Sequence, residues 1–238
     1  MAIIHNIYQK GKLTYAIPYT VRGGLKFSIK SKSRIVEKRS KQIFEREPLT
    51  IQWLESFDKH SVFVDVGANI GSYSLLSAKH KKTTTYAFEP QALNYAELCT
   101  NIYLNKLDII PYCVALSDVD KFDIFHLSEL VPGSADNSFA EKSNHTVSQG
   151  CYGTRLDSML ESGAIKQPDY IKIDVDGLEL NVLRGAEKCL ENAKETQVEL
   201  RKENGEEAEK FLSNLGYSID YDMSYQLNDY EVNYVFKR

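Results

Sequence analysis

Residues 62–74, VFVDVGANIGSYS, constrain the fold of this chain more than any other stretch. A short apolar strand reaches Asp65, a turn containing Gly67 and Gly71 follows, and small residues then allow a helix to begin. Glycines permit a tight turn, and the free N–H groups of a helix start can face a ligand at the carboxyl end of the strand. The run therefore predicts a nucleoside-type ligand at this turn.

The glycine spacing bears on which nucleoside cofactor fits. The dinucleotide fingerprint G-x-G-x-x-G needs a middle glycine where the main chain touches a pyrophosphate, and Asn69 stands there in this chain. Asp65 would repel a pyrophosphate and attract an ammonium group. Both residues favour a ligand with a cationic amino-acid end, such as S-adenosylmethionine. The alternative is a nicotinamide dinucleotide, and with it an oxidoreductase.

A second acid lies at a distance typical of nucleoside sites. The stretch TTTYAFEP predicts a strand that ends at Glu89, with Pro90 opening the next helix. Glu89 follows Gly67 by 22 positions, close to the roughly 20 residues at which a strand-end acid meets ribose hydroxyls. Taken alone, such a glutamate is more often an exposed charge. Together with the glycine turn, Glu89 is predicted to bind a ribose.

Five runs, in order, resemble the FkbM family of S-adenosylmethionine-dependent methyltransferases. They are GANIGSYS, AFEP, CVALSD at 113–118, TRLDSML at 154–160 and YIKIDVDGLELNVLRGA at 170–186. The resemblance covers residues 62 to about 200 and implies a Rossmann-like class I methyltransferase that methylates a hydroxyl of a sugar, polyketide or related metabolite. The cofactor contacts expected from turn, spacing and resemblance together are Asp65, Gly67, Ala68, Asn69, Gly71, Glu89, Ala115 and Asp174.

The run IKIDVDGLE, residues 171–179, contains the predicted chemistry. Asp174 ends a strand expected beside the glycine-turn strand, so its carboxylate should point into the crevice where open α/β sheets bind ligands. Methyl transfer is an in-line displacement, in which the protein mainly aligns the acceptor oxygen and helps to remove its proton. We therefore predict that Asp174 orients or deprotonates the acceptor. Lys172, on the same strand face, would pair with it or stabilise a developing alkoxide.

Two further acids have open alternatives. Asp176, with Glu179 three residues on, fits a helix capping box as well as it fits catalysis. Glu199 lies in a predicted strand, 197–200, and is either a third catalytic residue or a charge on an edge strand.

Other chemistry is less well supported by the sequence. His126 and His145 are alternative general bases because imidazole titrates near neutral pH. Asp174, Asp176 and Glu199 have the oxygen ligands that Mg²⁺ prefers, yet acids spread over two strands are common without metal, and no metal is predicted. A non-catalytic protein that kept the fold is the alternative from a different functional class.

Composition fits a folded cytoplasmic enzyme. The chain has 238 residues, 42% hydrophobic and 26% charged, which is ordinary for a soluble domain. No stretch approaches the roughly 18 apolar residues of a membrane span. The four cysteines, Cys99, Cys113, Cys151 and Cys189, lack C-x-x-C spacing and are predicted to be packing thiols.

Basic residues are concentrated near the N-terminus. Residues 1–41 contain ten lysines and arginines and one acid, whereas the net charge of the chain is −4. The cluster is either a solvated flank or a binding surface for an anionic acceptor, and nucleic acid is not the expected partner. The expected partner is a small-molecule or glycan acceptor.

Strand and helix patterns alternate from Val62 onward, which predicts a mostly parallel, doubly wound α/β sheet. A basic N-terminal extension, 1–58, is expected to contain short strands around Gly23 and a helical stretch at 34–57, followed by a methyltransferase domain, 59–238. An insertion at 120–153 is predicted to form a hairpin and a mobile loop. The remaining predicted elements are strands 62–66, 84–88, 109–114, 170–174 and 197–200, helices 71–79, 91–105, 178–190 and 206–214, and a C-terminal antiparallel hairpin of 217–222 with 231–236.

Overall fold

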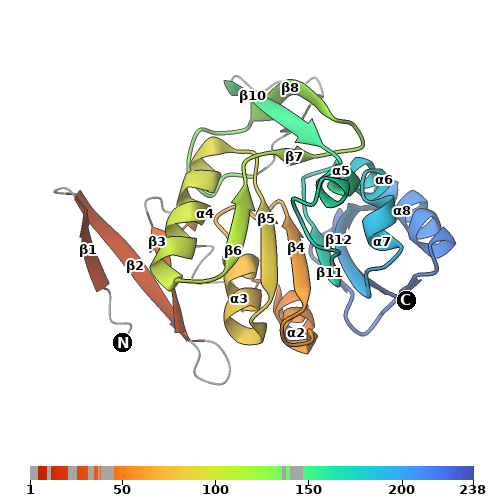
Figure 1. Ribbon diagram of the computed structural model, residues 1–238, viewed down its shortest axis with the longest axis horizontal. Helices are drawn as coiled ribbons and strands as arrows, with labels where there is room; N and C mark the ends of the chain where they lie inside the picture. Colours follow the sequence, from red (N-terminus) through yellow and green to blue (C-terminus); the bar gives the residue numbers. More distant parts are fainter. Residues whose placement is uncertain are drawn as a thin grey trace.

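The computed structural model describes residues 5–9, 12–20, 26–31, 35–36, 38, 46–135, 138–139 and 147–238. Its main sheet has the strand order β13-β15-β12-β11-β4-β5-β6, with β14 paired to β15 (Figure 1). The parallel strands are β4 (Val62–Val66), β5 (Thr84–Phe88), β6 (Ile109–Tyr112), β11 (Tyr170–Ile173) and β12 (Glu195–Arg201). The antiparallel strands are β13 (Ser218–Ile219), β14 (Tyr225–Gln226) and β15 (Glu231–Lys237). The predicted parallel sheet with an antiparallel C-terminal part is confirmed.

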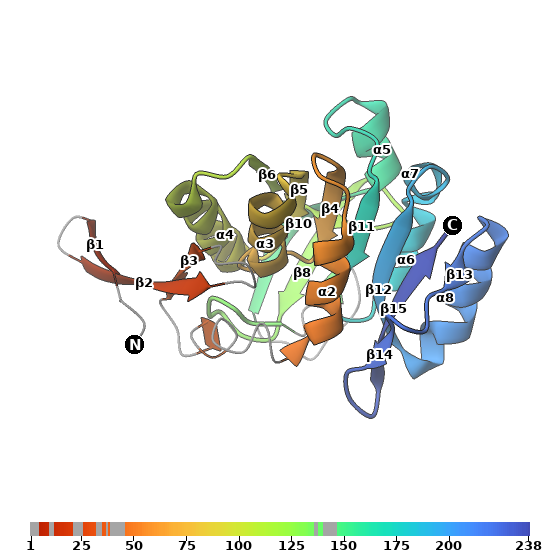
Figure 2. The ribbon, with the colours of Figure 1, turned by 90° about the horizontal axis from the view of Figure 1, so that it is seen from below.

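Alternate residues of a strand face opposite sides of the sheet, so apolar side chains project from both of its faces. Helices cover both faces. On β4, Phe63 packs with α2 (Pro48–Ser56), α3 (Ser72–Lys81) and α4 (Ala92–Asn105), whereas Val64 packs on the opposite face. The helices on that second face are α5 (Leu156–Glu161), α6 (Glu179–Arg184), α7 (Glu187–Leu190) and α8 (Lys202–Asn214). Figures 1 and 2 show the resulting three layers. Burying each large apolar side chain contributes roughly 1.5–3 kcal/mol.

The helix predicted over 178–190 is two helices, α6 and α7, separated at Gly185. A Cβ built on Gly185 would lie 2.0 Å from the carbonyl oxygen of Ser117. The helix is interrupted where the backbone that follows β7 (Ala115–Leu116) approaches it. Apolar spacing alone gives no sign of this tertiary contact.

The insertion forms a second sheet at the carboxyl ends of the main strands, at the top of Figure 1. Its order is β7-β10-β8-β9, built from β8 (Lys121–Leu127), β9 (Ser138–Phe139) and β10 (Val147–Thr154). Antiparallel pairing of β8 with β10 confirms the predicted hairpin. A mobile loop was expected next. Residues 131–135 form a loop between β8 and β9 in which Gly133 and Ser134 are buried, and its mobility stays a prediction. Residues 136–137 and 140–146 lie outside the described residues.

The N-terminal segment contains an antiparallel sheet of β1 (His5–Gln9), β2 (Lys12–Thr20) and β3 (Lys26–Ser31) that projects from the main body (Figures 1 and 2). The strand β3 joins the main core through Ile29, which is fully buried with side chains of α3 and α4. Within the stretch predicted as helical, α2 begins at Pro48, and residues 39–45 lie outside the described residues. The domain boundary at residue 58 stays a prediction.

No helix in the part of the chain that the structure describes combines the length and the apolar character needed to cross a membrane.

Candidate active site

A cavity of about 220 Å³ opens at the carboxyl ends of β4, β5, β11 and β12. The insertion contributes Phe125 of β8 and Phe139 of β9 to its wall. Glu47, just before α2, and Glu231, at the start of β15, line it as well. The cavity therefore lies where the sequence predicted a ligand crevice, and segments outside the resembling region complete it.

The glycine turn is held tightly between two strand ends. The N–H groups of Gly67 and Ala68 both donate to the carbonyl of Phe88, over 3.0 and 2.9 Å. Gly67 has φ +78°, and a Cβ there would lie 1.8 Å from the carbonyl oxygen of Asp174. No side chain larger than hydrogen fits at this contact, which explains the glycine.

Glu89 reaches back from the end of β5 to the glycine turn. One carboxylate oxygen accepts from the N–H of Asn69 at 2.8 Å, and the other accepts from the N–H of Gln91 at 2.8 Å. Burial raises the pKa of Glu89 to about 7, against the lowering effect of these two N–H groups. Glu89 therefore lies at the glycine turn, and its contact with a ribose stays a prediction.

Asn69 joins the turn to the insertion. Its backbone is left-handed, with φ +52°, and its side-chain Nδ2 donates to the carbonyl of Ser134 at 2.9 Å. The Nδ2 of Asn94, on α4, donates to the same carbonyl at 3.1 Å, and Asn94 Oδ1 accepts from the N–H of Gly133 at 2.7 Å. These bonds fix residues 133–134 as a wall of the cavity.

Asp65 lies beneath the turn rather than on the cavity wall. Its carboxylate is 1% exposed and accepts from the hydroxyl of Ser74 at 2.5 Å. Burial raises the pKa of Asp65, and the nearby Lys172 opposes that rise. Its other oxygen, Oδ1, has no hydrogen-bond partner among the described residues.

Gly71 is the other predicted cofactor residue that does not line the cavity. It precedes α3 with φ +88°, and a Cβ there would lie 2.4 Å from the side chain of Leu98. Its glycine thus permits close packing of α3 on α4. The predicted cofactor residues that do line the cavity are Gly67, Ala68, Asn69, Glu89, Ala115 and Asp174.

Asp174 and Lys172 form the ion pair that the sequence predicted. Lys172 Nζ lies 2.6 Å from Asp174 Oδ2, with Lys172 1% exposed and Asp174 26% exposed. The ammonium also lies 4.9 Å from the centre of the Tyr73 ring. Burial alone would lower the pKa of Lys172, but Asp174, Glu47 and Asp65 more than offset it, and the pKa is raised. Lys172 is a buried cation that holds Asp174 at the cavity floor.

Glu199 lies on β12, an interior strand between β11 and β15, so its interpretation as an edge-strand charge is wrong. It lines the cavity, and Asn233 Nδ2 donates to its Oε2 at 3.2 Å. Burial raises the pKa of Glu199, with a further rise from Asp174 and an opposing effect from Lys172. Protonation of Glu199 is therefore easier than for a solvated glutamate.

The helix-capping interpretation of Asp176 is also wrong. Leu178 occupies the N-cap of α6, and Asp176 instead lies in the left-handed region, with φ +58°, and lines the cavity. Glu179 accepts from the N–H of Gly177 at 2.8 Å, one residue beyond the N–H that a box capped by Asp176 would use.

The remaining candidates lie elsewhere. His126 does not line the cavity, and its ring lies 3.5 Å from the hydroxyl of Ser148. His145 lies outside the described residues. In the portion of the chain that the structure describes, no three His, Cys, Asp or Glu side chains are grouped as metal ligands would be.

The residues of the site that were not found from the sequence include Glu47, Tyr73, Ser134 and Glu231. Tyr73 stands inside the glycine-turn run, and its position on the first turn of α3 was the signal that could have identified it. Glu47 and Glu231 lie outside the run of motifs, and only the fold brings them to the cavity.

Comparisons with known proteins agree with this geometry. Residues 65–219 match a family model described as the Methyltransferase FkbM domain. Hexuronic acid methyltransferase AglP of Haloferax volcanii is 28% identical over 147 residues, which are 62% of this chain and 59% of that protein. Methyltransferase 1 of Beauveria bassiana is 26% identical over 148 residues, 54% of this chain and 59% of that protein. The matched stretch thus spans about three fifths of the length of each relative.

Among solved structures, an rRNA methylase from Streptococcus thermophilus matches with a TM-score of 0.51 at 11% identity, over 80% of this chain and 94% of that chain. A protein of the NADB-Rossmann superfamily from Streptococcus agalactiae also matches with a TM-score of 0.51, at 14% identity, over 79% of this chain and 67% of that chain. At such identities the likeness concerns the fold alone, which is Rossmann-like.

Proposed function

This chain belongs to the FkbM methyltransferase family, and we propose that it transfers a methyl group from S-adenosylmethionine to a hydroxyl of a sugar or related metabolite. The observation that carries the proposal is the meeting of three strand ends at one cavity. Gly67 follows β4, Glu89 follows β5 and Asp174 follows β11, and all three residues line the same cavity. The two relatives are named as methyltransferases, one of them acting on a hexuronic acid.

The lining of the cavity suits a cationic nucleoside better than a dinucleotide. Several carboxylates line it, whereas Arg46 is the one basic side chain that lines it among the described residues. Negative charge favours a sulfonium and an ammonium and disfavours a pyrophosphate. A dinucleotide turn has glycine at the position of Asn69, so this residue also disfavours a dinucleotide. When bound, S-adenosylmethionine supplies an activated methyl group on a sulfonium.

We assign the parts of this cofactor to different residues around the glycine turn. We assign Glu89 to the ribose, because one carboxylate can accept from two vicinal hydroxyls. Asp65 acts from beneath the turn through its charge, since its side chain does not reach the cavity. Phe125 and Phe139 are apolar walls on the insertion side, suited to an adenine ring.

Asp174 is the proposed acceptor-orienting group and base. Its carboxylate accepts the proton of the acceptor hydroxyl while the oxygen forms its bond to the methyl carbon. Lys172 is a positioning residue that holds one carboxylate oxygen at 2.6 Å and leaves the other free for the acceptor. Glu199, on the neighbouring strand end, is placed to bind the acceptor as a second carboxyl group.

Calorimetric titration with S-adenosylmethionine, S-adenosylhomocysteine and NAD tests the cofactor assignment. We expect binding of the first two and none of NAD, and loss of binding in Gly67→Val. The matched control is Gly163→Val, because Gly163 has φ +73° and open space around its Cβ position. Binding of NAD alone would replace the assignment by an oxidoreductase.

Methyl release on a panel of sugar and polyketide acceptors then separates an enzyme from a cofactor-binding protein. We expect product with the wild type and a large loss, on the order of 10²-fold or more, in Asp174→Asn, as for removal of a general base. Cofactor binding without turnover on any acceptor would favour a non-catalytic partner protein.

A further inference from the structure

The acceptor half of the cavity is acidic. Four carboxylates line it, from the ends of β11 and β12, the start of β15 and the segment before α2: Asp174, Glu199, Glu231 and Glu47. Their charges interact at Glu199, since Asp174, Glu47 and Glu231 each disfavour its ionisation. This half of the site concentrates negative charge.

Neighbouring cations neutralise only part of that charge. Lys172 pairs with Asp174 at 2.6 Å, and Arg201 Nε lies 3.9 Å from Glu231 Oε1. Arg46, which precedes Glu47 in the chain, also lines the cavity, so three cations stand against four carboxylates among the described residues. The hydrogen-bond donors that hold the other two carboxylates in the described residues are neutral. Thr50 and Tyr225 donate to Glu47, which is 5% exposed, and Asn233 donates to Glu199.

Among positions 1–41, none of the residues whose side chains the structure describes lines the cavity. The hypothesis that those residues bind an anionic acceptor therefore gains no support from the cavity wall. Six of the ten basic residues lie outside the described residues: Lys10, Arg22, Lys32, Arg34, Arg39 and Lys41.

We propose that the acceptor site selects a sugar that bears an ammonium group beside the hydroxyl to be methylated, and rejects a sugar that bears a carboxylate. This inference rests on the proposed function and adds the substrate class. An ammonium placed among the acidic side chains of the cavity gains attraction from Glu47 and Glu231 and favours ionisation of Glu199, whose pKa is raised by burial. A carboxylate is repelled by Glu47 and Glu231. The preference distinguishes this chain from the relative named for a hexuronic acid.

The acceptor test uses three matched sugars: methyl glucosaminide, methyl glucoside and methyl glucuronide. Each is titrated into protein saturated with S-adenosylhomocysteine, below the pKa of the sugar amine. We expect the glucosaminide to bind about tenfold or more tightly than the glucoside, and the glucuronide to bind about tenfold or more weakly, as charge complementarity at a partly desolvated site implies. Added salt should narrow both differences.

Variants locate the preference in the cavity. Glu231→Gln, at a partly exposed position, should reduce the ratio of glucosaminide to glucoside affinity by about threefold to tenfold, because one attractive charge is lost. Glu47→Gln should reduce it as well. The matched control is Glu191→Gln, an exposed glutamate that does not line the cavity, and it should leave the ratio unchanged.

Failure of this inference can be distinguished from failure of the proposed function. If S-adenosylhomocysteine binds but the glucuronide equals or exceeds the glucosaminide, or none of the three sugars binds, the acceptor inference is overturned and the cofactor assignment stands. If S-adenosylhomocysteine itself does not bind, the proposed function fails and the acceptor inference fails with it.

Discussion

Lys172 is a buried cation among carboxylates, and its charge is needed there. Methionine has a similar volume without the charge, so Lys172→Met would leave Asp174, Asp65 and Glu47 uncompensated. We expect this variant to lower the free energy of unfolding by about 3–5 kcal/mol, the usual result of breaking a buried pair from one side. Urea denaturation followed by circular dichroism measures it.

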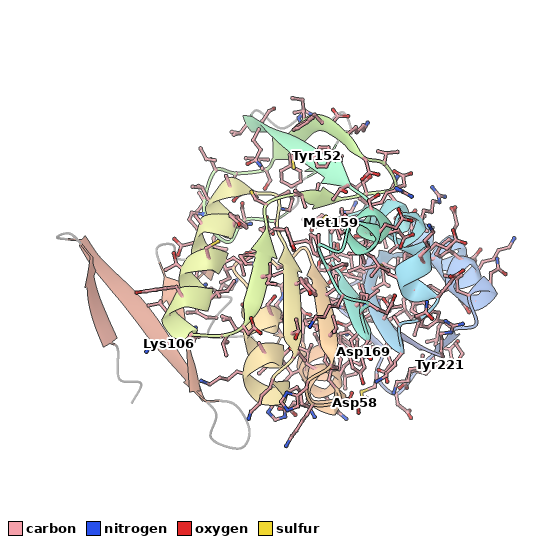
Figure 3. The ribbon with its side chains drawn as sticks, viewed as in Figure 1. Asp58, Lys106, Tyr152, Met159, Asp169 and Tyr221 are labelled. Atoms are coloured by element: carbon pink, nitrogen blue, oxygen red, sulfur yellow. The ribbon has the colours of Figure 1, made fainter. Side chains whose placement is uncertain are left out.

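Lys194 offers the matched control for that measurement. It pairs with Asp58 at 2.8 Å and Asp169 at 3.1 Å but is 50% exposed. Figure 3 places Asp58 and Asp169 at the end of the sheet opposite the insertion. Lys194→Met should cost about 0–1 kcal/mol, as for exposed ion pairs. Equal losses in the two variants would contradict the buried-cation interpretation.

Glu89 should make cofactor affinity depend on pH. Its pKa in the folded protein is about 7 because of burial, so the carboxylate form that we propose accepts two ribose hydroxyls becomes dominant only above that value. We expect affinity for S-adenosylhomocysteine to rise by up to about tenfold between pH 6 and pH 8, as ionisation with this pKa requires. Calorimetry at several pH values measures the rise.

Glu89→Gln is the control for that pH dependence. The amide keeps the size of the side chain but cannot ionise, so the variant should bind more weakly and with a flatter pH profile. A wild-type profile that is flat from pH 6 to 8, or that falls, would show that Glu89 does not meet the ribose as a carboxylate.

The sequence identified site residues that belong to motifs, and it did not identify those that lie outside them. Gly67, Glu89 and Asp174 were found because each ends a recognisable strand, and parallel strand ends meet at one edge of a sheet. Asp65 was expected at the cofactor, yet lies beneath the turn, since the sequence does not tell which face of β4 a side chain takes. Glu47 and Glu231 were missed because no spacing connects them to the motifs.

Among the helices and strands, the connection of β4 to α3 depends on Gly67. Both a positive φ and a clash of 1.8 Å with the Asp174 carbonyl oppose a side chain there. We expect Gly67→Ala to destabilise the protein by about 3 kcal/mol or more, since the backbone of β11 must move. Thermal denaturation compares it with the wild type.

Gly163→Ala separates the two causes of that loss. Gly163 has φ +73°, like Gly67, but nothing lies within 4 Å of its Cβ position. Gly163→Ala should therefore lower the free energy of unfolding only by the backbone strain, roughly 1–2 kcal/mol. If the two alanine variants were equally stable, the close contact with Asp174 would not be a source of strain.

The regular elements of the sheet were the most predictable part of the fold. Strands β4 and β5 have the bounds expected from the sequence, because both are short runs rich in β-branched and aromatic residues and bordered by turns. Prediction failed at Gly185, which divides α6 from α7, because a tertiary contact decides the outcome there. Residues 131–135 form the loop that their small residues predict, but the hydrogen bonds from Asn69 and Asn94 that place this loop at the cavity have no sequence signal.

Across the entire chain, buried acids should set the pH dependence of stability. Burial raises the pKa of Asp65, Glu89, Glu179 and Glu199. Between the pKa of each acid in the unfolded chain and its raised pKa in the folded protein, the folded state binds more protons than the unfolded state. The free energy of unfolding therefore falls as pH rises through that range. For Glu89 alone, a shift from 4.5 to about 7 is on the order of 3 kcal/mol.

Acids nearer the surface act in a lower pH range. Hydrogen bonds and cations lower the pKa of Asp58, Asp120, Asp123, Glu161 and Asp220. The stability that these groups add is present above their ordinary pKa, near 4, and is lost only in stronger acid. We therefore expect stability of the cofactor-free protein to be greatest near pH 5 and to decline toward pH 8. Urea denaturation at pH 5, 6.5 and 8 tests this, and rising stability over that range would refute it.

The carbonyl of Ser134 receives amide donors from both Asn69 and Asn94. These bonds connect the loop after β8 with the glycine turn, which in the proposed function binds the methyl donor. Grafting residues 120–153 from another family member should therefore spare donor affinity only when the grafted loop places a backbone carbonyl within reach of Asn69 and Asn94. Chimeras whose loop moves this carbonyl away should lose donor affinity together with turnover.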